Sequence, residues 1–181
     1  VSVSYYRANP AIFTVSGDST IRAAYIASAA PLPPPPVDVD FSDGFESGSF
    51  SAWDSTYATT GESVSISSTS YSGSYGARYA TSGGGGFEYA YSTLSIPEAS
   101  QLYARGMVRV DTSGLSDEAD RVTFIRFLGD SESVAFAGLR RVNGVVLWSL
   151  IIRDGSGWVV ENSASGPSSG QWYNVELRWV E

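Results

Sequence analysis

Hydrophobic and polar residues alternate along much of the chain, in short runs that glycine- and serine-rich segments separate. Residues 62–67 and 87–91 alternate with a period of two, which predicts strands with two unlike faces. About eight short strands with frequent turns predict an all-β fold of two packed antiparallel sheets. Further strands are expected at 77–80, 102–110, 121–128, 133–141, 145–153, 158–161 and 171–180.

Asn143 and Gly144 stand between two apolar runs and predict a tight hairpin turn. The run after this turn is apolar on both faces, so we expect a central strand that is covered on both sides. The cover would be the partner sheet on one face and a loop, a hairpin or a neighbouring subunit on the other. The first face holds Val146, Trp148, Leu150 and Ile152, and the second holds Val145, Leu147 and Ile151.

The first 41 residues differ from the rest of the chain. Residues 1–30 contain two strand-like runs, 11–15 and 20–26, and are expected to form a β-hairpin. An isolated hairpin is marginally stable in water, so this segment needs either the following module or another chain to cover its apolar face. Residues 31–41 form a proline-rich linker, which favours a semi-rigid polyproline II spacer over a ligand for an aromatic groove.

Charge and residue types exclude several kinds of chemistry. The net charge of −8 and the pI near 4.5 disfavour nucleic-acid binding, because the 11 positive residues are scattered. All of them are Arg, and the chain has no Lys, His or Cys. An imidazole base, an amine nucleophile, thiol catalysis and disulfides are therefore absent. No stretch approaches the length of apolar sequence that a membrane-spanning helix needs.

Three motifs carry a resemblance to a known family: residues 43–48 with Trp53, residues 71–78, and residues 170–177. This pattern is similar to concanavalin A-like (laminin G-like) jelly-roll domains, which occur in secreted polysaccharide-active proteins, adhesins and phage or viral surface proteins. The resemblance covers residues 42–181 and implies an antiparallel two-sheet jelly-roll sandwich. Family members usually continue with further strands, so we expect either a piece of a longer protein or a subunit completed in trans.

Residues 9–26 resemble the last two strands of the internalin-type B-repeat, which is found in bacterial and archaeal surface proteins. This second resemblance implies that residues 1–30 belong to a partial repeat domain or act as a strand-exchange segment. Both resemblances imply an exported protein, located outside the cell, at the cell surface or on a virion.

The acidic residues give little sign of catalysis and one sign of a metal site. Glycosidases of this fold use spaced carboxylates on one strand, and no such triplet is present, so we expect no enzyme. Asp38, Asp40, Asp43 and Glu46 offer the hard oxygen ligands that Ca²⁺ prefers. The family resemblance points to Glu46 as a ligand, with Asp43, of a structural calcium ion. The alternative is a solvated acidic junction between linker and module.

Aromatic residues are the candidates for binding a glycan, because exposed rings can pack on sugar faces. We select Trp158, Tyr89, Tyr91 and Trp53, whereas Trp148 and Trp172 are expected in the core. The alternation of residues 87–91 puts Phe87, Tyr89 and Tyr91 on one face, which is either a binding strip or half of the sandwich core.

The sequence thus favours a non-catalytic extracellular or virion-surface module for carbohydrate binding and adhesion. The alternative is a structural subunit of an extracellular filament, capsid or tail that assembles with identical copies by β-strand exchange. Expected partners are glycans or cell-surface polysaccharide and further copies of the chain, with neither nucleic acid nor membrane insertion.

Overall fold

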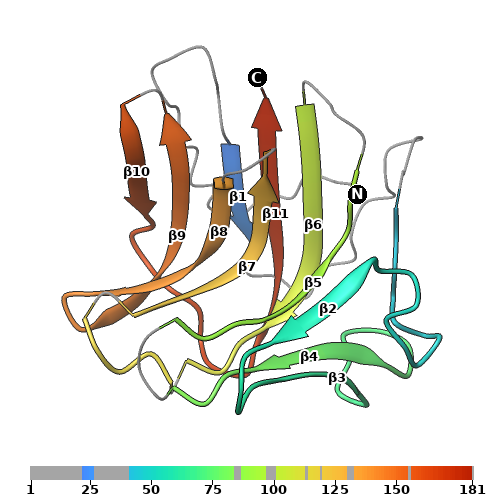
Figure 1. Ribbon diagram of the computed structural model, residues 1–181. Coiled ribbons are helices and arrows are strands. Elements are labelled where there is room, and N and C mark those ends of the chain that lie inside the picture. Colours follow the sequence, from blue (N-terminus) through green and yellow to red (C-terminus); the bar gives the residue numbers. More distant parts are fainter. Residues whose placement is uncertain are drawn as a thin grey trace. The chain divides into compact units, whose positions relative to one another are not determined.

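The computed structural model describes residues 22–26, 41–83, 87–96, 101–112, 114–118, 120–129, 133–154 and 156–180. These residues form β-strands and no helix, and all of their strand pairings are antiparallel (Figure 1). The predicted all-β fold is confirmed for this part of the chain, which also contains no helix able to cross a membrane. The strands are β1 (Arg22–Ile26), β2 (Ser55–Ala58), β3 (Ser63–Ser67), β4 (Gly76–Ala80), β5 (Ala90–Thr93), β6 (Gln101–Arg109), β7 (Arg121–Leu128), β8 (Ser133–Val142), β9 (Val145–Asp154), β10 (Gly157–Asn162) and β11 (Trp172–Val180).

Most strands lie where the alternation predicts them. β3, β4 and β6 to β11 match the predicted positions to within a residue at each end, and β1 corresponds to the second predicted run of the N-terminal hairpin. β5 begins at Ala90, later than the predicted start at Phe87. β2 was not predicted, because its Ser-Thr-Tyr-Ala sequence does not alternate. The predicted strand 11–15 and residues 31–40 of the linker lie outside the described residues.

The chain forms two compact units, and the segment 42–181 contributes to both of them. The first unit is Val1–Phe41 with Ala99–Glu181, and the second is Ser42–Glu98. Among the described residues, β1 and β6 to β11 belong to the first unit, and β2 to β5 belong to the second. Each unit is described by itself below.

In the first unit, two antiparallel sheets pack through a shared hydrophobic core and form a sandwich. One sheet has the strand order β1-β11-β6 and the other β10-β9-β8-β7 (Figure 1). Burial of apolar surface, worth about 25 cal/mol per Å², holds the two sheets together. The buried core residues are Ala104, Val110, Phe127, Ala135, Ala137, Leu139, Trp148, Leu150, Ile152, Tyr173, Val175 and Leu177.

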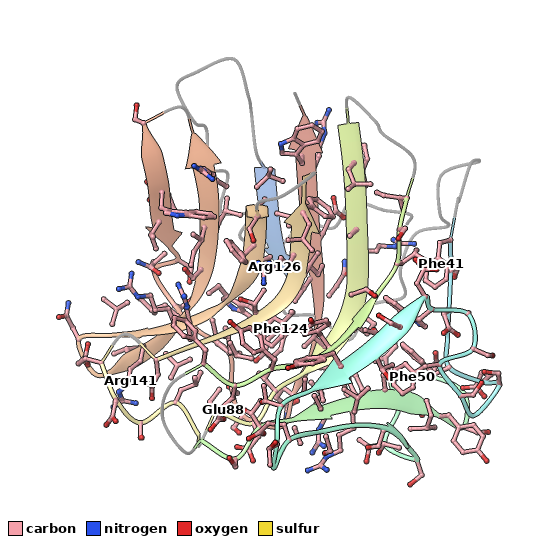
Figure 2. All side chains as sticks on the ribbon, viewed as in Figure 1. Phe41, Phe50, Glu88, Phe124, Arg126 and Arg141 are labelled. Carbon is pink, nitrogen blue, oxygen red and sulfur yellow. The ribbon has the colours of Figure 1, made fainter. Side chains whose placement is uncertain are left out.

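β9 is an interior strand of its sheet, as its two apolar faces predicted. Trp148 and Leu150 point into the core, and the ring of Trp148 lies 6.2 Å from that of Phe124, which β7 contributes (Figure 2). On the opposite face Ile151 is buried but Val145 is exposed. The second face of β9 is therefore covered only in part.

Trp172, predicted as a core residue, is half-buried instead. It pairs with Arg109 of β6, and the next residue, Tyr173, is the one that enters the core. Successive side chains of a strand point to opposite faces, so Tyr173 in the core puts Trp172 on the outer face of its sheet.

Two features of the four-stranded sheet depend on local backbone geometry. Asn143 and Gly144 both have positive φ, 50° and 79°, which is the conformation of a tight hairpin turn and confirms the predicted one. Gly138 of β8 faces a bulge in β7, where a Cβ atom would overlap the carbonyl oxygen of Val122. Only glycine fits there without moving one of the two strands.

β1 forms one edge of the three-stranded sheet. Its five residues all pair with β11, from Arg22 opposite Arg178 to Ile26 opposite Asn174. The pairing occupies backbone groups of β11 that would otherwise be unpaired. Residues 22–26 are thus a strand of the first unit's own sandwich.

The second unit contains two small sheets, β2-β5 and β3-β4. None of its described residues is buried, so it has no core comparable with that of the first unit. Aromatic contacts organise its opening segment: the ring of Phe45 stacks on Trp53 at 6.0 Å and meets the edge of Phe50 at 5.5 Å. Phe50 in turn lies 6.1 Å from Tyr79 of β4.

Candidate functional site

Four aromatic side chains form an exposed row on the second unit, here termed the ring row. Phe87, Tyr89, Tyr91 and Tyr57 have relative exposures of 76%, 39%, 40% and 50%. In this order, consecutive ring centroids are 6.5, 6.3 and 5.4 Å apart. An exposed apolar patch of adjoining side chains is typical of an interaction site. The sequence left open whether residues 87–91 form an exposed strip or part of the core, and the structure shows that their aromatic side chains are exposed.

The backbone fixes the positions of these rings. Alternation along the chain puts Phe87, Tyr89 and Tyr91 on one side, and the register of β2 with β5 places Tyr57 opposite Tyr91. Thr59 extends the pairing beyond the end of β2: its N–H donates to the Tyr89 carbonyl at 2.9 Å, and the Tyr89 N–H donates to Thr59 Oγ1 at 3.1 Å. Tyr57, Tyr89 and Tyr91 therefore lie on paired backbone, whereas Phe87 precedes β5.

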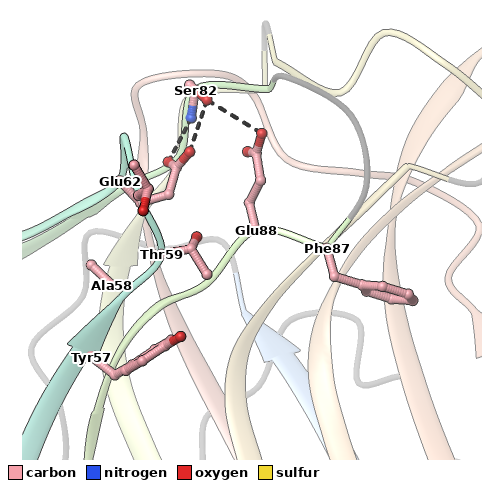
Figure 3. Close-up of a pocket in the computed structure, with 8 residues that line it drawn as sticks. Tyr57, Ala58, Thr59, Glu62, Ser82, Phe87 and Glu88 are labelled. Atoms are coloured by element: carbon pink, nitrogen blue, oxygen red, sulfur yellow. Dashed lines mark hydrogen bonds between the residues drawn. The ribbon is translucent and has the colours of Figure 1, made fainter.

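An open pocket of about 550 Å³ adjoins the ring row (Figure 3). This volume lies within the range of about 300–1,000 Å³ that is common for small-molecule sites. Tyr57 and Phe87 belong both to the row and to the pocket wall. The lining residues are Tyr57, Ala58, Thr59, Thr60, Glu62, Ser82, Phe87 and Glu88.

Glu62 and Glu88 bring two carboxylates to this pocket, and Ser82 connects them (Figure 3). The N–H and hydroxyl of Ser82 lie 2.7 and 2.8 Å from the two oxygens of Glu62, and the same hydroxyl lies 3.3 Å from Glu88 Oε1. The N–H of Gly83 donates to Glu88 Oε2 at 2.9 Å. Because a carboxylate offers about four acceptor positions, Glu62 can accept further hydrogen bonds from a ligand.

Trp53 and Asp43, predicted as a ligand-binding and a calcium-binding residue, contact each other. The indole Nε1 donates to Asp43 Oδ2 at 2.8 Å, and the N–H of Phe45 donates to Asp43 Oδ1 at 2.7 Å. Trp53 is half-buried in the opening segment and is not a member of the ring row. Both residues thus have a structural part in this segment.

Glu46 joins two of the three motifs that the sequence singled out. Its carboxylate accepts the backbone N–H groups of Ser74, at 3.0 Å, and Tyr75, at 3.1 Å. These two hydrogen bonds, from Ser74 first and Tyr75 second, lower the pKa of Glu46 below its ordinary value. A Cβ atom at Gly73, where φ is 74°, would overlap this carboxylate. Gly73 in the motif 71–78 therefore leaves the space that the carboxylate of Glu46, in the motif 43–48, occupies.

Among the residues that the structure describes, no cluster of ligands surrounds the predicted calcium site. The described part of the chain contains no group of three or more acidic, His or Cys side chains that could hold a metal ion. Asp38 and Asp40 lie outside the described residues. Structural calcium at Asp43 and Glu46 therefore stays a prediction.

Trp158 lies on β10 of the first unit and is 51% exposed. Its ring is 5.3 Å from that of Phe136 and 6.0 Å from the guanidinium carbon of Arg153. The predicted ligand residues thus fall on two units: Tyr89 and Tyr91 come together in the ring row, whereas Trp158 belongs to a separate surface.

Glu176 of β11 has the most perturbed acid–base behaviour that the structure shows among its described carboxyls. It is 8% exposed, and burial raises its pKa to about 7, against the opposing effects of Arg105 and Arg178. Arg105 Nη1 and Arg178 Nε are themselves buried without a hydrogen-bond partner among the described residues. This carboxyl therefore titrates near neutral pH.

Sequence reasoning missed three members of the site. It did not select Tyr57, and it assigned no role to Glu62 or Glu88. The facing of Tyr57 and Tyr91 depends on the pairing of β2 with β5. A local pattern carries no signal of that pairing, because β2 itself does not alternate.

Comparisons of the chain with protein-family models, with curated proteins and with solved structures found no match.

Proposed function

We propose that this chain is a non-catalytic extracellular or virion-surface module that binds carbohydrate through the ring row and the adjoining pocket. The observation that carries the proposal is the exposure of four aromatic rings side by side next to two carboxylates. A sugar has apolar C–H faces and hydroxyl-rich edges. Aromatic rings pack against the faces, and carboxylates accept hydrogen bonds from the hydroxyl groups.

The chemistry of the pocket supports binding rather than catalysis. Its polar members are Glu62, Glu88, Ser82, and the hydroxyls of Tyr57 and two threonines, and because the chain has no His, Lys or Cys, the two carboxylates are the only strong bases in the pocket. Glu62 and Glu88 both contact the hydroxyl of Ser82. These contacts hold the two carboxylates in place, so both can act as fixed hydrogen-bond acceptors for a ligand. The resemblance of the sequence motifs to concanavalin A-like domains supports the extracellular assignment.

A glycan array probed with the full chain tests this proposal, followed by titration of the best-bound glycan. Tyr57→Ala and Phe87→Ala each remove one ring of the row. If a ring contributes as much as a ring that stacks on a nucleic-acid base, about 1–3 kcal/mol, each variant weakens binding about 5- to 150-fold.

Tyr75→Ala is the matched control for these variants, because Tyr75 lies on the same unit, is 42% exposed and is not part of the row. We expect this variant to bind like the original chain. Equal loss of binding in all three variants would contradict the assignment of the ring row.

The second candidate function is a structural subunit that assembles by strand exchange. The pairing of β1 with β11 favours it, because a strand at the edge of a sheet can be supplied by a neighbouring copy as well as by the same chain. Size-exclusion chromatography with light scattering at two concentrations tests it. Exchange predicts oligomers that grow with concentration and disappear when residues 1–30 are deleted. A monomer at both concentrations contradicts it.

A further inference from the structure

The outward face of the four-stranded sheet in the first unit is rich in arginine and is here termed the arginine face. Strand register places Arg121, Arg126, Arg140 and Arg153 at positions that point away from the core. None of the outward positions on the described parts of these strands is Asp or Glu. Four of the 11 cationic residues thus gather on one face of a chain whose net charge is −8.

Two aromatic rings lie between two of these arginines. The guanidinium carbon of Arg126 is 5.2 Å from the centre of the Phe136 ring, which is 5.3 Å from the ring of Trp158 (Figure 2 labels Arg126). The guanidinium carbon of Arg153 lies 6.0 Å from the centre of the Trp158 ring. These four side chains come from all four strands of the sheet and combine two cations with the exposed ring of Trp158. This combination suits a ligand that has both an apolar face and a negative group.

Arg121 and Arg140 form a second group of cations on this face. They lie directly opposite each other on β7 and β8, and neither guanidinium has a hydrogen-bond or ion-pair partner among the described residues. Arg141, by contrast, donates to the Leu115 carbonyl at 3.0 Å and lies 4.0 Å from Glu118. Like charges directly opposite on two strands destabilise a sheet. An anion bound between the two guanidinium groups would replace this repulsion with charge-assisted hydrogen bonds.

Two polar atoms between the arginine groups have no hydrogen-bond partner in the described part of the chain. Ser149 and Asn162 pair across β9 and β10, and Gly138 is opposite Ser149 on β8, midway between Phe136 and Arg140. Ser149 is 3% exposed, and its Oγ, like Asn162 Oδ1, is buried without a partner. Buried polar atoms are nearly always hydrogen-bonded. Because these two atoms are buried, the middle of the face is covered, and a ligand on the surface would contact the residues on either side of it.

We propose that the arginine face binds an acidic polysaccharide. Carboxylate or sulfate groups contact Arg121, Arg140 and Arg126, and sugar rings pack on Trp158. Along β9 the face spans seven residues, from Arg153 to Leu147, which is opposite Arg140. This is about 20 Å of strand, enough for several sugar units. Nucleic acids fit less well, because their binding requires the neutralisation of many phosphates by a chain of net charge −8.

The test is isothermal titration of the full chain at low salt with four probes: a polygalacturonate fragment, a sulfated dextran oligosaccharide, a neutral dextran oligosaccharide and inorganic sulfate. We expect at least one acidic oligosaccharide to bind and the neutral one not to compete with it. Whether the carboxylated or the sulfated probe binds more tightly identifies the anionic group. Arg121→Gln with Arg140→Gln should weaken acidic binding at least about tenfold.

Two controls separate this site from general charge and from the ring row. Arg78→Gln removes one exposed arginine from β4 of the second unit, and Tyr57→Ala removes a ring of the row; neither should change acidic binding. A melting temperature of the double variant equal to or above that of the original chain shows that the variant is folded. Because the ring row is on the other unit, failure of this proposal leaves the proposed function untouched.

Three results would overturn the proposal. The first is no binding of either acidic oligosaccharide. The second is a loss of acidic binding in Arg78→Gln as large as in the double variant, which would show attraction by general charge only. The third is self-association that the double variant abolishes while acidic glycans do not bind, in which case the face contacts a second copy of the chain.

Discussion

In the first unit a hydrophobic core joins two sheets, whereas in the second unit none of the described residues is buried. The first unit packs apolar side chains between its two sheets, and it also buries the carboxyl of Glu176. In the second unit the large aromatic residues of β2 and β5 are exposed instead. The same residue types thus serve packing in one unit and are available to a ligand in the other.

Polar contacts organise much of the second unit. Asp43, Glu46, Asp54 and Glu62 each accept at least one backbone N–H, for example that of Ser95 by Asp54 at 2.6 Å. Such hydrogen bonds fix turns without burying apolar surface. Substitutions in the two units should therefore have different effects. Changes in the core of the first unit affect stability, and changes in the ring row of the second unit affect binding.

The largest effect is expected from Leu177→Ala in the core of the first unit. Leu177 is fully buried, and the loss of a leucine side chain from a core costs about 2–5 kcal/mol. Urea unfolding monitored by tryptophan fluorescence measures this change. Leu128→Ala is the control, because Leu128 of β7 is 60% exposed and its loss should stay within about 0.5 kcal/mol. Equal losses of unfolding free energy in the two variants would show that Leu177 is not part of the hydrophobic core.

Next in size is the effect of Glu176→Gln, which should stabilise the first unit above pH 7. Burial raises the pKa of Glu176 from 4.5 in the unfolded chain to about 7 in the folded protein, so the folded state favours the protonated carboxyl. Its contribution to stability is complete below pH 4.5 and is lost as the pH rises to 7.

The glutamine variant lacks this titration, so at pH 8 it should be more stable than the original chain by up to about 3 kcal/mol. At pH 4 the two should be equal. Melting temperatures of both chains at the two pH values measure the difference. A variant that is less stable at pH 8 would mean that the electrostatic attraction to Arg105 and Arg178 outweighs the cost of burial.

A smaller effect of opposite sign is expected in the second unit. Hydrogen bonds from Ser74 and Tyr75 lower the pKa of Glu46, so its contribution is present above pH 4.5 and is lost as the pH falls through the lowered value. In an NMR titration, the amide protons of Ser74 and Tyr75 should shift together with one apparent pKa below 4.5. Glu46→Gln should abolish this titration. Amide shifts that stay constant in the original chain would contradict the contact.

The strands could be predicted from sequence because alternation is a local signal. The runs 121–128, 133–141 and 145–153 predicted β7, β8 and β9 to within a residue at each end, and the Asn143–Gly144 turn fixes how β8 and β9 pair. The pairing of β1 with β11 and of β2 with β5 joins distant parts of the chain, and no local pattern specifies it. The division of residues 42–181 between two units depends on the same distant contacts.

The candidate site could be predicted in part for the same reason. Alternation gave the shared side of Phe87, Tyr89 and Tyr91, but only the fold shows that this side is exposed. The acidic residues Asp43 and Glu46 suggested a cation, whereas the structure shows their oxygens bound to N–H groups of the chain. A carboxylate can bind either a cation or N–H groups, and the sequence alone does not show which of the two lies next to it in the folded chain.

The most direct test of the central claim is the dissociation constant of the Tyr57→Ala/Phe87→Ala double variant for the neutral glycan that the original chain binds best. Both side chains are at least half exposed, so the variant should keep its melting temperature. We predict that it loses binding about tenfold or more, whereas Tyr75→Ala and a folded Leu177→Ala bind like the original chain. Unchanged binding by the double variant would contradict the claim that the ring row is the site.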